Sequence, residues 1–161
     1  MQHLPYTSQD EADTTRLGRA LAQCLPETIT VALLGTLGAG KTRFVQAVAA
    51  GCGIDPASVT SPPFVLCQPH FGARTLYHLD AYRIQDLDEF LELGVSEYFD
   101  GPGITLIEWA ERVTPCLPDD YLEVQIEITG PYSRSFDLVA HGPVSAAALD
   151  RLAADMHLIG G

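Results

Sequence analysis

Residues 35–42 read Gly35-Thr36-Leu37-Gly38-Ala39-Gly40-Lys41-Thr42, the pattern of a phosphate-binding loop: glycine, four residues, Gly-Lys and a hydroxyl residue. Glycines let the backbone curl so that successive N–H groups face phosphate oxygens. The Lys41 ammonium would reach the β and γ phosphates, and the Thr42 hydroxyl would be offered to Mg²⁺. Lys41 is the only lysine of the chain, although a glycine-rich turn with an accidental lysine is the alternative. The motif predicts binding of a nucleoside triphosphate with magnesium.

The segments that flank this loop supply the context that the motif needs. Residues 28–34 are β-branched and apolar, which is typical of a strand buried inside a sheet. Residues 41–50 carry apolar side chains at helical spacing, and Gly51 follows as a C-terminal cap. The sequence therefore predicts a strand, a glycine turn and a helix in succession.

The rest of the chain alternates between strand and helix patterns. Ser8 and Glu11 have the spacing of a capping box, which predicts that a first helix begins there and ends before Pro26. Further strands are expected at 64–68, 74–79, 104–107, 122–129 and 135–140, and further helices at 86–93 and 144–156. The sum predicts an α/β fold: a P-loop NTPase-like three-layer domain, with a mixed β-sheet flanked by helices, that takes up residues 1–161 as a single domain.

Composition excludes several classes of protein. The chain has 21 acidic and 9 basic residues and a net charge of -12, so a nucleic-acid backbone would repel it unless its basic groups were concentrated on one face. The amino-terminal segment has acids where a secretory signal has basic residues, and no apolar run is long enough for a membrane span. Four irregularly spaced cysteines without a C-x-x-C pair favour free thiols over a zinc site or disulfides. We expect a soluble, cytoplasmic protein with no membrane partner.

Two carboxylates follow predicted strands and are candidates for the metal and the reaction. Glu108 follows residues 104–107 and would coordinate Mg²⁺ directly or through water, unless it only caps the next turn. Asp80 follows residues 74–79 and would position or deprotonate the attacking water or hold a metal-bound water. The alternative for Asp80 is a hydrogen bond to a local backbone turn.

Three other side chains leave their roles open. His78, inside an apolar strand pattern, is interpreted as a hydrogen-bonded structural residue and not as an acid, base or ligand. Arg134 follows a Gly-Pro turn and would either approach the triphosphate or lie in solvent. Trp109 would pack in the core, face a partner or stack on the nucleotide.

Taken together, the motifs resemble one family along nearly the whole chain, the bacterial tRNA threonylcarbamoyladenosine biosynthesis ATPases called TsaE or YjeE. The resemblance is carried by Asp10-Glu11, Thr14, Leu17-Gly18, the loop 35–42, Ser61-Pro62 with Phe64, the block from His78 to Arg83, Glu89, Leu93-Gly94, Glu108-Trp109 and Glu111. Taken alone, only the loop is specific, but few other families combine all these motifs in this order.

The resemblance implies a P-loop ATPase that binds ATP and Mg²⁺ and works with the proteins TsaD and TsaB. It would thereby sustain the formation of threonylcarbamoyladenosine at position 37 of tRNAs that read codons beginning with A. It would supply hydrolysis and not be the transferase, and the partners would supply the tRNA surface. The positions that match the family assign Mg²⁺ to Thr42 and Glu108, catalysis to Lys41, Asp80 and Glu108, and the phosphates to Lys41 and the loop amides. They also place Thr14 and Glu111 near the adenosine and Arg134 near the phosphates.

One position departs from the family pattern. Pro63 stands where the family usually has threonine, which removes a hydroxyl and an N–H donor. If that threonine senses the γ phosphate or the metal, Ser61 or Thr60 must do so here.

Rival functions share the loop but need features that this sequence lacks or leaves open. A small-molecule kinase would need an arginine-rich lid, and the basic residues here are scattered singly. A GTPase needs an N/T-K-x-D motif, which a chain with one lysine inside the loop cannot contain. A subunit that binds nucleotide only as a structural ligand remains as the third alternative.

Overall fold

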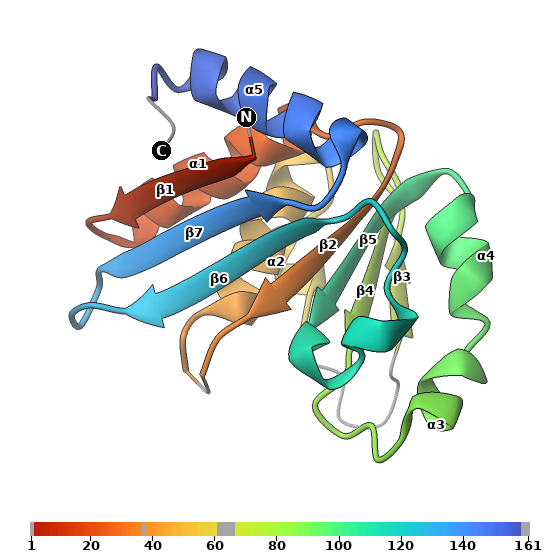
Figure 1. Ribbon diagram of the computed structural model, residues 1–161. Helices are drawn as coiled ribbons and strands as arrows, with labels where there is room; N and C mark the ends of the chain where they lie inside the picture. The colour runs from red at the N-terminus through yellow and green to blue at the C-terminus, as the bar shows by residue number, and fades with distance from the viewer. Residues whose placement is uncertain (1, 37, 61–66, 159–161) are drawn as a thin grey trace.

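A computed structural model describes residues 2–36, 38–60 and 67–158, and one seven-stranded sheet runs through them (Figure 1). The strand order is β1-β7-β6-β2-β5-β4-β3. The strands are β1 (His3–Ser8), β2 (Thr28–Leu34), β3 (Cys67–His70), β4 (Leu76–Asp80), β5 (Gly103–Glu108), β6 (Leu122–Ile128) and β7 (Arg134–Ala140).

The sheet is mixed, with a parallel centre. Strands β6, β2, β5 and β4 run parallel to their neighbours in that group, whereas β7 and β3 pair antiparallel at its two sides, and β1 pairs antiparallel with β7. Because the central strands are parallel, their carboxyl ends meet at one edge of the sheet, where α/β proteins bind ligands. The predicted mixed α/β sheet is confirmed.

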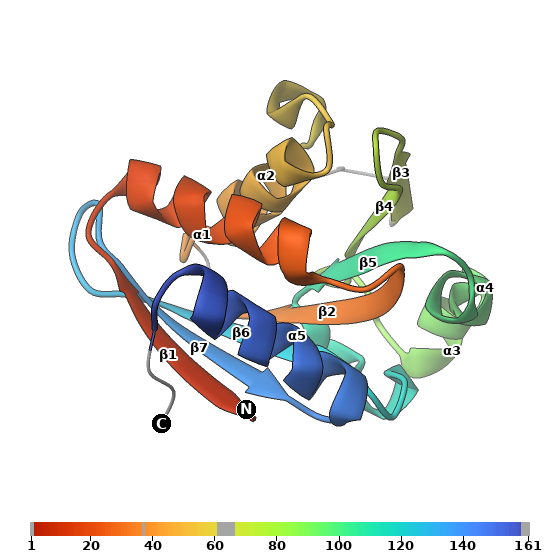
Figure 2. The same cartoon turned by 90° about the horizontal axis from the view of Figure 1, so that it is seen from above.

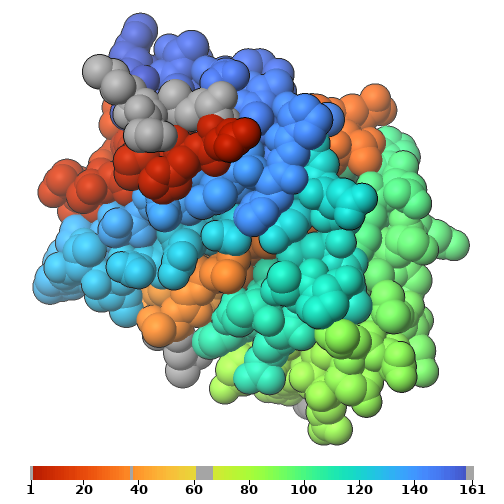
Figure 3. All heavy atoms as spheres, viewed as in Figure 1, coloured from red at the N-terminus to blue at the C-terminus, as the bar shows by residue number. Residues whose placement is uncertain are grey.

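Helices lie on both sides of the sheet and make three layers. Helices α1 (Glu11–Cys24), α2 (Lys41–Gly51) and α5 (Pro143–Asp155) cover one face (Figure 2). Helices α3 (Leu87–Leu91) and α4 (Val95–Asp100) and the 3-10 turns η2 (Ala110–Arg112) and η3 (Thr114–Cys116) lie toward the other face, and the turn η1 (Pro56–Ser58) follows α2. On that second face, the strands β6 and β7 form part of the molecular surface (Figure 3), where Gln125 and Glu127 are exposed.

The alternation of side chains along the strands produces two separate cores. On β2, Val31 and Leu33 pack into the core beneath α1, α2 and α5, whereas Ala32 between them joins the core on the face of α3 and α4. On β5, Leu106 and Ile107 divide in the same way. Both faces of the central strands are therefore buried, as the nearly continuous apolar pattern of residues 28–34 predicts.

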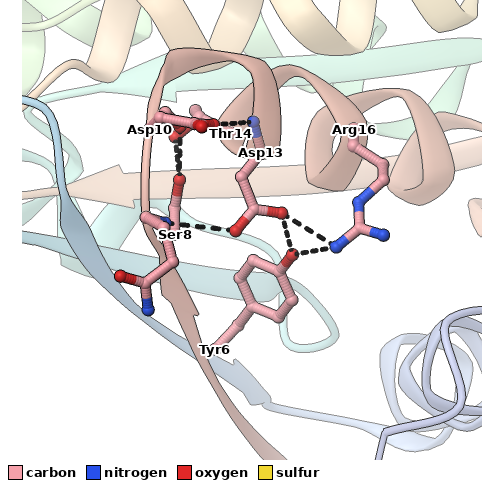
Figure 4. Close-up of polar contacts among 7 residues, drawn as sticks. Tyr6, Ser8, Asp10, Asp13, Thr14 and Arg16 are labelled. Carbon is pink, nitrogen blue, oxygen red and sulfur yellow. Dashed lines mark hydrogen bonds and ion pairs between the residues drawn. The ribbon is translucent and has the colours of Figure 1, made fainter.

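The amino-terminal prediction was wrong in its detail. Ser8 does not cap the first helix; it is the last residue of β1, a strand that was not predicted. The N-cap of α1 is Asp10, whose side chain accepts the Asp13 backbone N–H at 2.8 Å (Figure 4). Only Leu4, Tyr6 and Ser8 of β1 point inward, and a six-residue edge strand that contains a proline and polar residues carries a weak pattern.

Other boundaries differ by a few residues. Helix α4 was not predicted, and α3 is shorter than the range 86–93, with Asp86 as its N-cap. The predicted strand at 64–68 is observed from Cys67, and its residues 64–66 lie outside the described part of the chain. The two predicted antiparallel hairpins, β3 with β4 and β6 with β7, are confirmed.

The four cysteines are free thiols, as predicted. Cys24 and Cys52 are buried, and burial raises the pKa of each thiol, as it does for Cys67 and Cys116. Cys24 and Cys52 are therefore core thiols of low reactivity, whereas Cys67 and Cys116 are partly buried. Among the described residues, every helix is too short or too polar to cross a membrane.

Two carboxylates fasten helix starts to the sheet. Asp120 precedes β6 and accepts the backbone N–H groups of Val144 and Ser145 and the Ser145 hydroxyl, at 2.7, 3.1 and 2.7 Å, so it caps α5 from a distant part of the chain. Burial alone would raise the pKa of Asp120, but these donors outweigh it and hold the pKa below its ordinary value.

Asp13 plays the corresponding part at the start of α1. Its carboxylate accepts the Tyr6 hydroxyl at 2.5 Å, an Arg16 N–H at 2.9 Å and the Gln9 backbone N–H at 3.1 Å (Figure 4). Burial alone would raise the pKa of Asp13, but the bonds from Tyr6, Gln9 and Arg16 lower it below its ordinary value. The network joins β1 to α1.

Candidate functional site

The glycine-rich loop connects the end of β2 to the start of α2 at the carboxyl edge of the sheet. Gly35, Gly38 and Gly40 have φ angles of 153°, 82° and 99°, which side chains disfavour, and a Cβ on Gly35 would lie 2.6 Å from the Ile126 carbonyl oxygen. Gly40 is the N-cap of α2 and offers no side chain to the first backbone N–H groups of that helix. Those N–H groups are a ready site for an anion. Leu37 lies outside the described residues.

Lys41 is held inside this loop. Its side chain is 5% exposed, and its Nζ donates to the carbonyl oxygens of Gly35 and Thr36 at 2.6 and 3.0 Å and lies 3.8 Å from the centre of the Trp109 ring. Burial lowers the pKa of Lys41, and the charges of nearby carboxylates, Glu111 foremost, oppose this shift without cancelling it. The ammonium therefore lies beside the candidate anion site, hydrogen-bonded to carbonyl oxygens of the same loop.

Glu108 meets Thr42 next to the loop. Strand β5 ends at Glu108, which lies opposite Leu33 of β2 and Asp80 of β4 because the three strands are parallel and in register. The Thr42 hydroxyl lies 2.9 and 3.0 Å from the two oxygens of the Glu108 carboxylate, and that residue is 3% exposed. The structure therefore brings together the two residues that were predicted to hold the metal.

Asp80 lies at the same edge and forms a local turn. Its carboxylate accepts the Tyr82 backbone N–H at 2.9 Å, which is the bond that the alternative interpretation expected. Burial raises the pKa of Asp80, the bond from Tyr82 works against the shift, and the charge of Glu108 adds to it. The turn does not exclude a catalytic role, because a carboxylate has a second oxygen and a raised pKa suits a proton acceptor.

His78 also contacts Glu108, which sequence reasoning missed. The imidazole is fully buried and its Nε2 lies 2.5 Å from Oε2 of Glu108, so the expected hydrogen bond is made to the candidate metal ligand itself. The signal that could have revealed this contact is the spacing: His78 and Asp80 are two residues apart on β4 and share a face of the strand next to β5.

A cavity of about 310 Å³ opens on the other side of the loop. Arg134 lies at its wall, where Nε donates to the Ala39 carbonyl at 2.9 Å and Nη1 to the carbonyls of Gly130 and Ser133. Thr14 also lines the cavity, and its hydroxyl lies 2.6 Å from that of Ser8. The other lining residues are Glu11, Ala39, Gly40, Arg43, Pro131, Tyr132 and Phe136.

Glu111 is placed apart from this cavity. It lies exposed in η2, after β5, and is not among the described residues that line the cavity with Thr14 and Arg134. Its negative charge acts on Lys41 instead. The preceding Trp109 has φ 59° and packs against Tyr82 as well as Lys41, with ring centroids 4.9 Å apart for the two aromatic side chains.

The predicted switch segment cannot be compared with these groups, because residues 61–66, including Ser61 and Pro63, lie outside the described part of the chain. Thr60, immediately before this segment, is exposed.

A strand, a glycine loop and a helix that carries lysine and threonine, with a buried carboxylate on the neighbouring strand, define a P-loop protein of the α/β class. A family model described as threonylcarbamoyl adenosine biosynthesis protein TsaE matches residues 8–136. The chain belongs to the TsaE family, as the sequence motifs predicted.

Individual relatives agree with this assignment. The chain is 39% identical over 127 residues to the tRNA threonylcarbamoyladenosine biosynthesis protein TsaE of Treponema pallidum, covering 79% of this chain and 93% of the relative. It is 34% identical over 143 residues to the protein of the same name from Bacillus subtilis, with 88% and 89% covered. The crystal structure of YdiB from Bacillus subtilis matches with a TM-score of 0.81 and 28% identity, covering 96% of this chain and 97% of the other.

Proposed function

We propose that this protein is the ATPase subunit of tRNA threonylcarbamoyladenosine formation, and that it hydrolyses ATP to ADP and phosphate in complex with TsaD and TsaB. The observation that carries the proposal is the contact of Thr42 with the buried Glu108 beside the loop lysine, in a chain of the TsaE family. We also propose that it acts in the cytoplasm.

The donor set of the site fits Mg²⁺. A hydroxyl and a carboxylate are hard oxygen ligands, and Mg²⁺ is commonly bound by one or two such groups together with waters and phosphate oxygens. No group of three or more His, Cys, Asp or Glu side chains among the described residues could hold a metal, so a cage made by protein alone does not compete with this arrangement. Thr42 and Glu108 would hold the ion, which when bound neutralises charge on the β and γ phosphates.

The protein's own groups would do three things. The N–H groups at the start of α2 bind phosphate oxygens, and the Lys41 ammonium moves from the Gly35 and Thr36 carbonyls to the phosphates. Asp80, whose pKa is raised, orients the attacking water or accepts its proton. In the neighbouring cavity, Arg134 binds the phosphates and Thr14 lies near the adenosine, for which Glu111 is the second proposed residue.

The decisive experiment is ATP turnover by the purified protein alone and with TsaD and TsaB, followed by reconstituted tRNA modification with and without it. Slow hydrolysis alone, stimulation by both partners and modification that needs this chain would support the proposal. Stimulation by a metabolite with a phosphorylated product would favour the small-molecule kinase. Binding without turnover in the complex would favour a structural nucleotide.

Alanine variants separate the roles within the site. Glu108→Ala and Asp80→Ala are expected to lower turnover more than ATP affinity, because the loop still holds the phosphates. Equal losses of turnover and affinity, measured by single-turnover kinetics and calorimetry, would show that the carboxylates only support the fold.

A further inference from the structure

His78 is a fully buried imidazole with a single hydrogen-bond partner among the described residues. Its Nε2 contacts Oε2 of Glu108, and its Nδ1 is buried without a partner. An ionised carboxylate can only accept, so the bond requires a proton on Nε2. The geometry therefore selects the tautomer that donates from Nε2.

The Glu108 carboxylate is consequently held by two unequal contacts. The Thr42 hydroxyl lies almost equally far from both carboxylate oxygens, 2.9 and 3.0 Å, and so does not choose between them. His78 contacts Oε2 alone. Of the two, only the imidazole distinguishes the oxygens: it fixes Oε2 toward β4 and leaves Oε1 in contact with the Thr42 hydroxyl.

The orientation of the Glu108 carboxylate matters because charged groups lie near it. Glu108 and Asp80 are neighbours in register on β5 and β4, and the charge of Glu108 raises the pKa of Asp80. The charge of Glu108 also acts on the Lys41 ammonium. Without His78, the Glu108 carboxylate would be held by the Thr42 hydroxyl alone, between a repelling carboxylate and an attracting ammonium, and could exchange its two oxygens by rotation.

We propose that His78 is a positioning residue that fixes the Glu108 carboxylate for Mg²⁺ by donating from Nε2 to Oε2. This inference rests on the proposed function, since it assumes that Glu108 serves the magnesium–nucleotide complex. His78 is a positioning and not a catalytic residue in this assignment, because its fully buried imidazole acts through Glu108. Its effect is on how strongly magnesium strengthens nucleotide binding.

The test compares His78→Gln, whose side-chain amide can still donate toward Glu108, with His78→Leu, which cannot. His70→Leu is the matched control, because His70 is a buried histidine of the adjacent β3 whose hydrogen bond goes to Gln68. The readout is the dissociation constant of the non-hydrolysable analogue AMP-PNP, measured by calorimetry with EDTA and with increasing Mg²⁺. Thermal unfolding of every variant shows whether it is folded.

We expect the magnesium-free affinity of His78→Leu to stay within about 2-fold of the wild type, and its gain in affinity from Mg²⁺ to fall about 10-fold, the loss of one hydrogen bond to a charged group. His78→Gln should recover most of that gain, and His70→Leu should keep all of it. A folded His78→Leu with the full magnesium gain would overturn the inference and leave the proposed function intact, as would equal losses in the Gln and Leu variants. A wild-type protein without magnesium-dependent binding would overturn both.

Discussion

The carboxyl edge of the central strands and the starts of α1 and α5 use buried charge in opposite ways. At the edge, burial prevails over the available partners, so the pKa of Lys41 is lowered and that of Asp80 is raised, each toward its neutral form. At the helix starts, hydrogen-bond donors prevail over burial, so the pKa values of Asp13 and Asp120 are lowered and the charge is favoured.

The difference is the one expected if Lys41 and Asp80 serve the proposed nucleotide site and Asp13 and Asp120 serve the fold. A charge that the folded protein holds at a disadvantage costs stability, so such a group is a candidate for a role in binding or catalysis. A charge that the folded protein favours stabilises it directly. Substitutions in the two regions should therefore have different effects. Variants at the carboxyl edge should lose ATP binding or turnover and keep their stability, whereas variants at the helix starts should lose stability and keep ATP binding and turnover.

The largest effect is expected for Lys41→Met. Removal of a charged donor from the phosphate site should weaken ATP binding about 100-fold, or about 2.7 kcal/mol. Stability should change little, because the lost bonds to the Gly35 and Thr36 carbonyls are offset by relief of a buried ammonium. Calorimetry with ATP and thermal unfolding measure the two quantities, and a large drop in Tm with unchanged affinity would reverse the assignment of this region.

The opposite outcome is expected for Asp120→Ala. Loss of the cap that holds Val144 and Ser145 should lower the free energy of unfolding by about 2 kcal/mol, while ATP affinity stays the same. Asp119→Ala is the matched control, because this neighbouring carboxylate is exposed. Urea unfolding and ATP titration of both variants provide the measurement, and equal stability of the two would show that the cap is not needed.

Parts of both regions could be predicted from the sequence. What could be predicted depends on local patterns, whereas contacts between residues far apart in the sequence could not be predicted. The loop, the strand at 28–34 and the pairing of Thr42 with Glu108 follow from local patterns and from the rule that parallel strands end together. The cap of α5 by Asp120 could not be predicted, since it joins residues about two dozen positions apart through a side chain that no local pattern marks.

The same reasoning explains what the sequence left undetermined around the site. His78 was recognised as a hydrogen-bonded residue, but its partner depends on the register between β4 and β5, which no single strand reveals. The place of Glu111 near the adenosine is implied by resemblance alone and stays a prediction; the chain puts this residue after β5, where its charge acts on Lys41. Ser8 was misassigned because the edge strand β1 has little apolar alternation to show where it ends.

A smaller effect on stability, with a distinct pH dependence, is expected for Asp13→Asn. The folded-state pKa of Asp13 lies below its ordinary value of 3.8, so its contribution to stability is complete above that value and is lost as the pH falls through the folded pKa. The variant should lose about 1 kcal/mol at pH 7 and approach the wild type in acid. Urea unfolding between pH 3 and 7, with Asp119→Asn as the control, measures this, and a loss that does not depend on pH would refute the assigned cause.

The smallest effect has the opposite sign and is expected for the stability of Asp80→Asn. Because the folded-state pKa of Asp80 lies above its ordinary value of 3.8, the folded protein loses stability as the pH rises from that value through the folded pKa, and the penalty persists at neutral pH. Asparagine removes the charge yet keeps an oxygen that can accept the Tyr82 N–H. The variant should therefore raise Tm by about 2 °C at pH 7, match the wild type near pH 4, and hydrolyse ATP more slowly at unchanged affinity.

Thermal unfolding between pH 4 and 7 measures the change in Tm. A fall in Tm at neutral pH would place Asp80 with Asp13 and Asp120 as a carboxylate that the fold favours in its charged form.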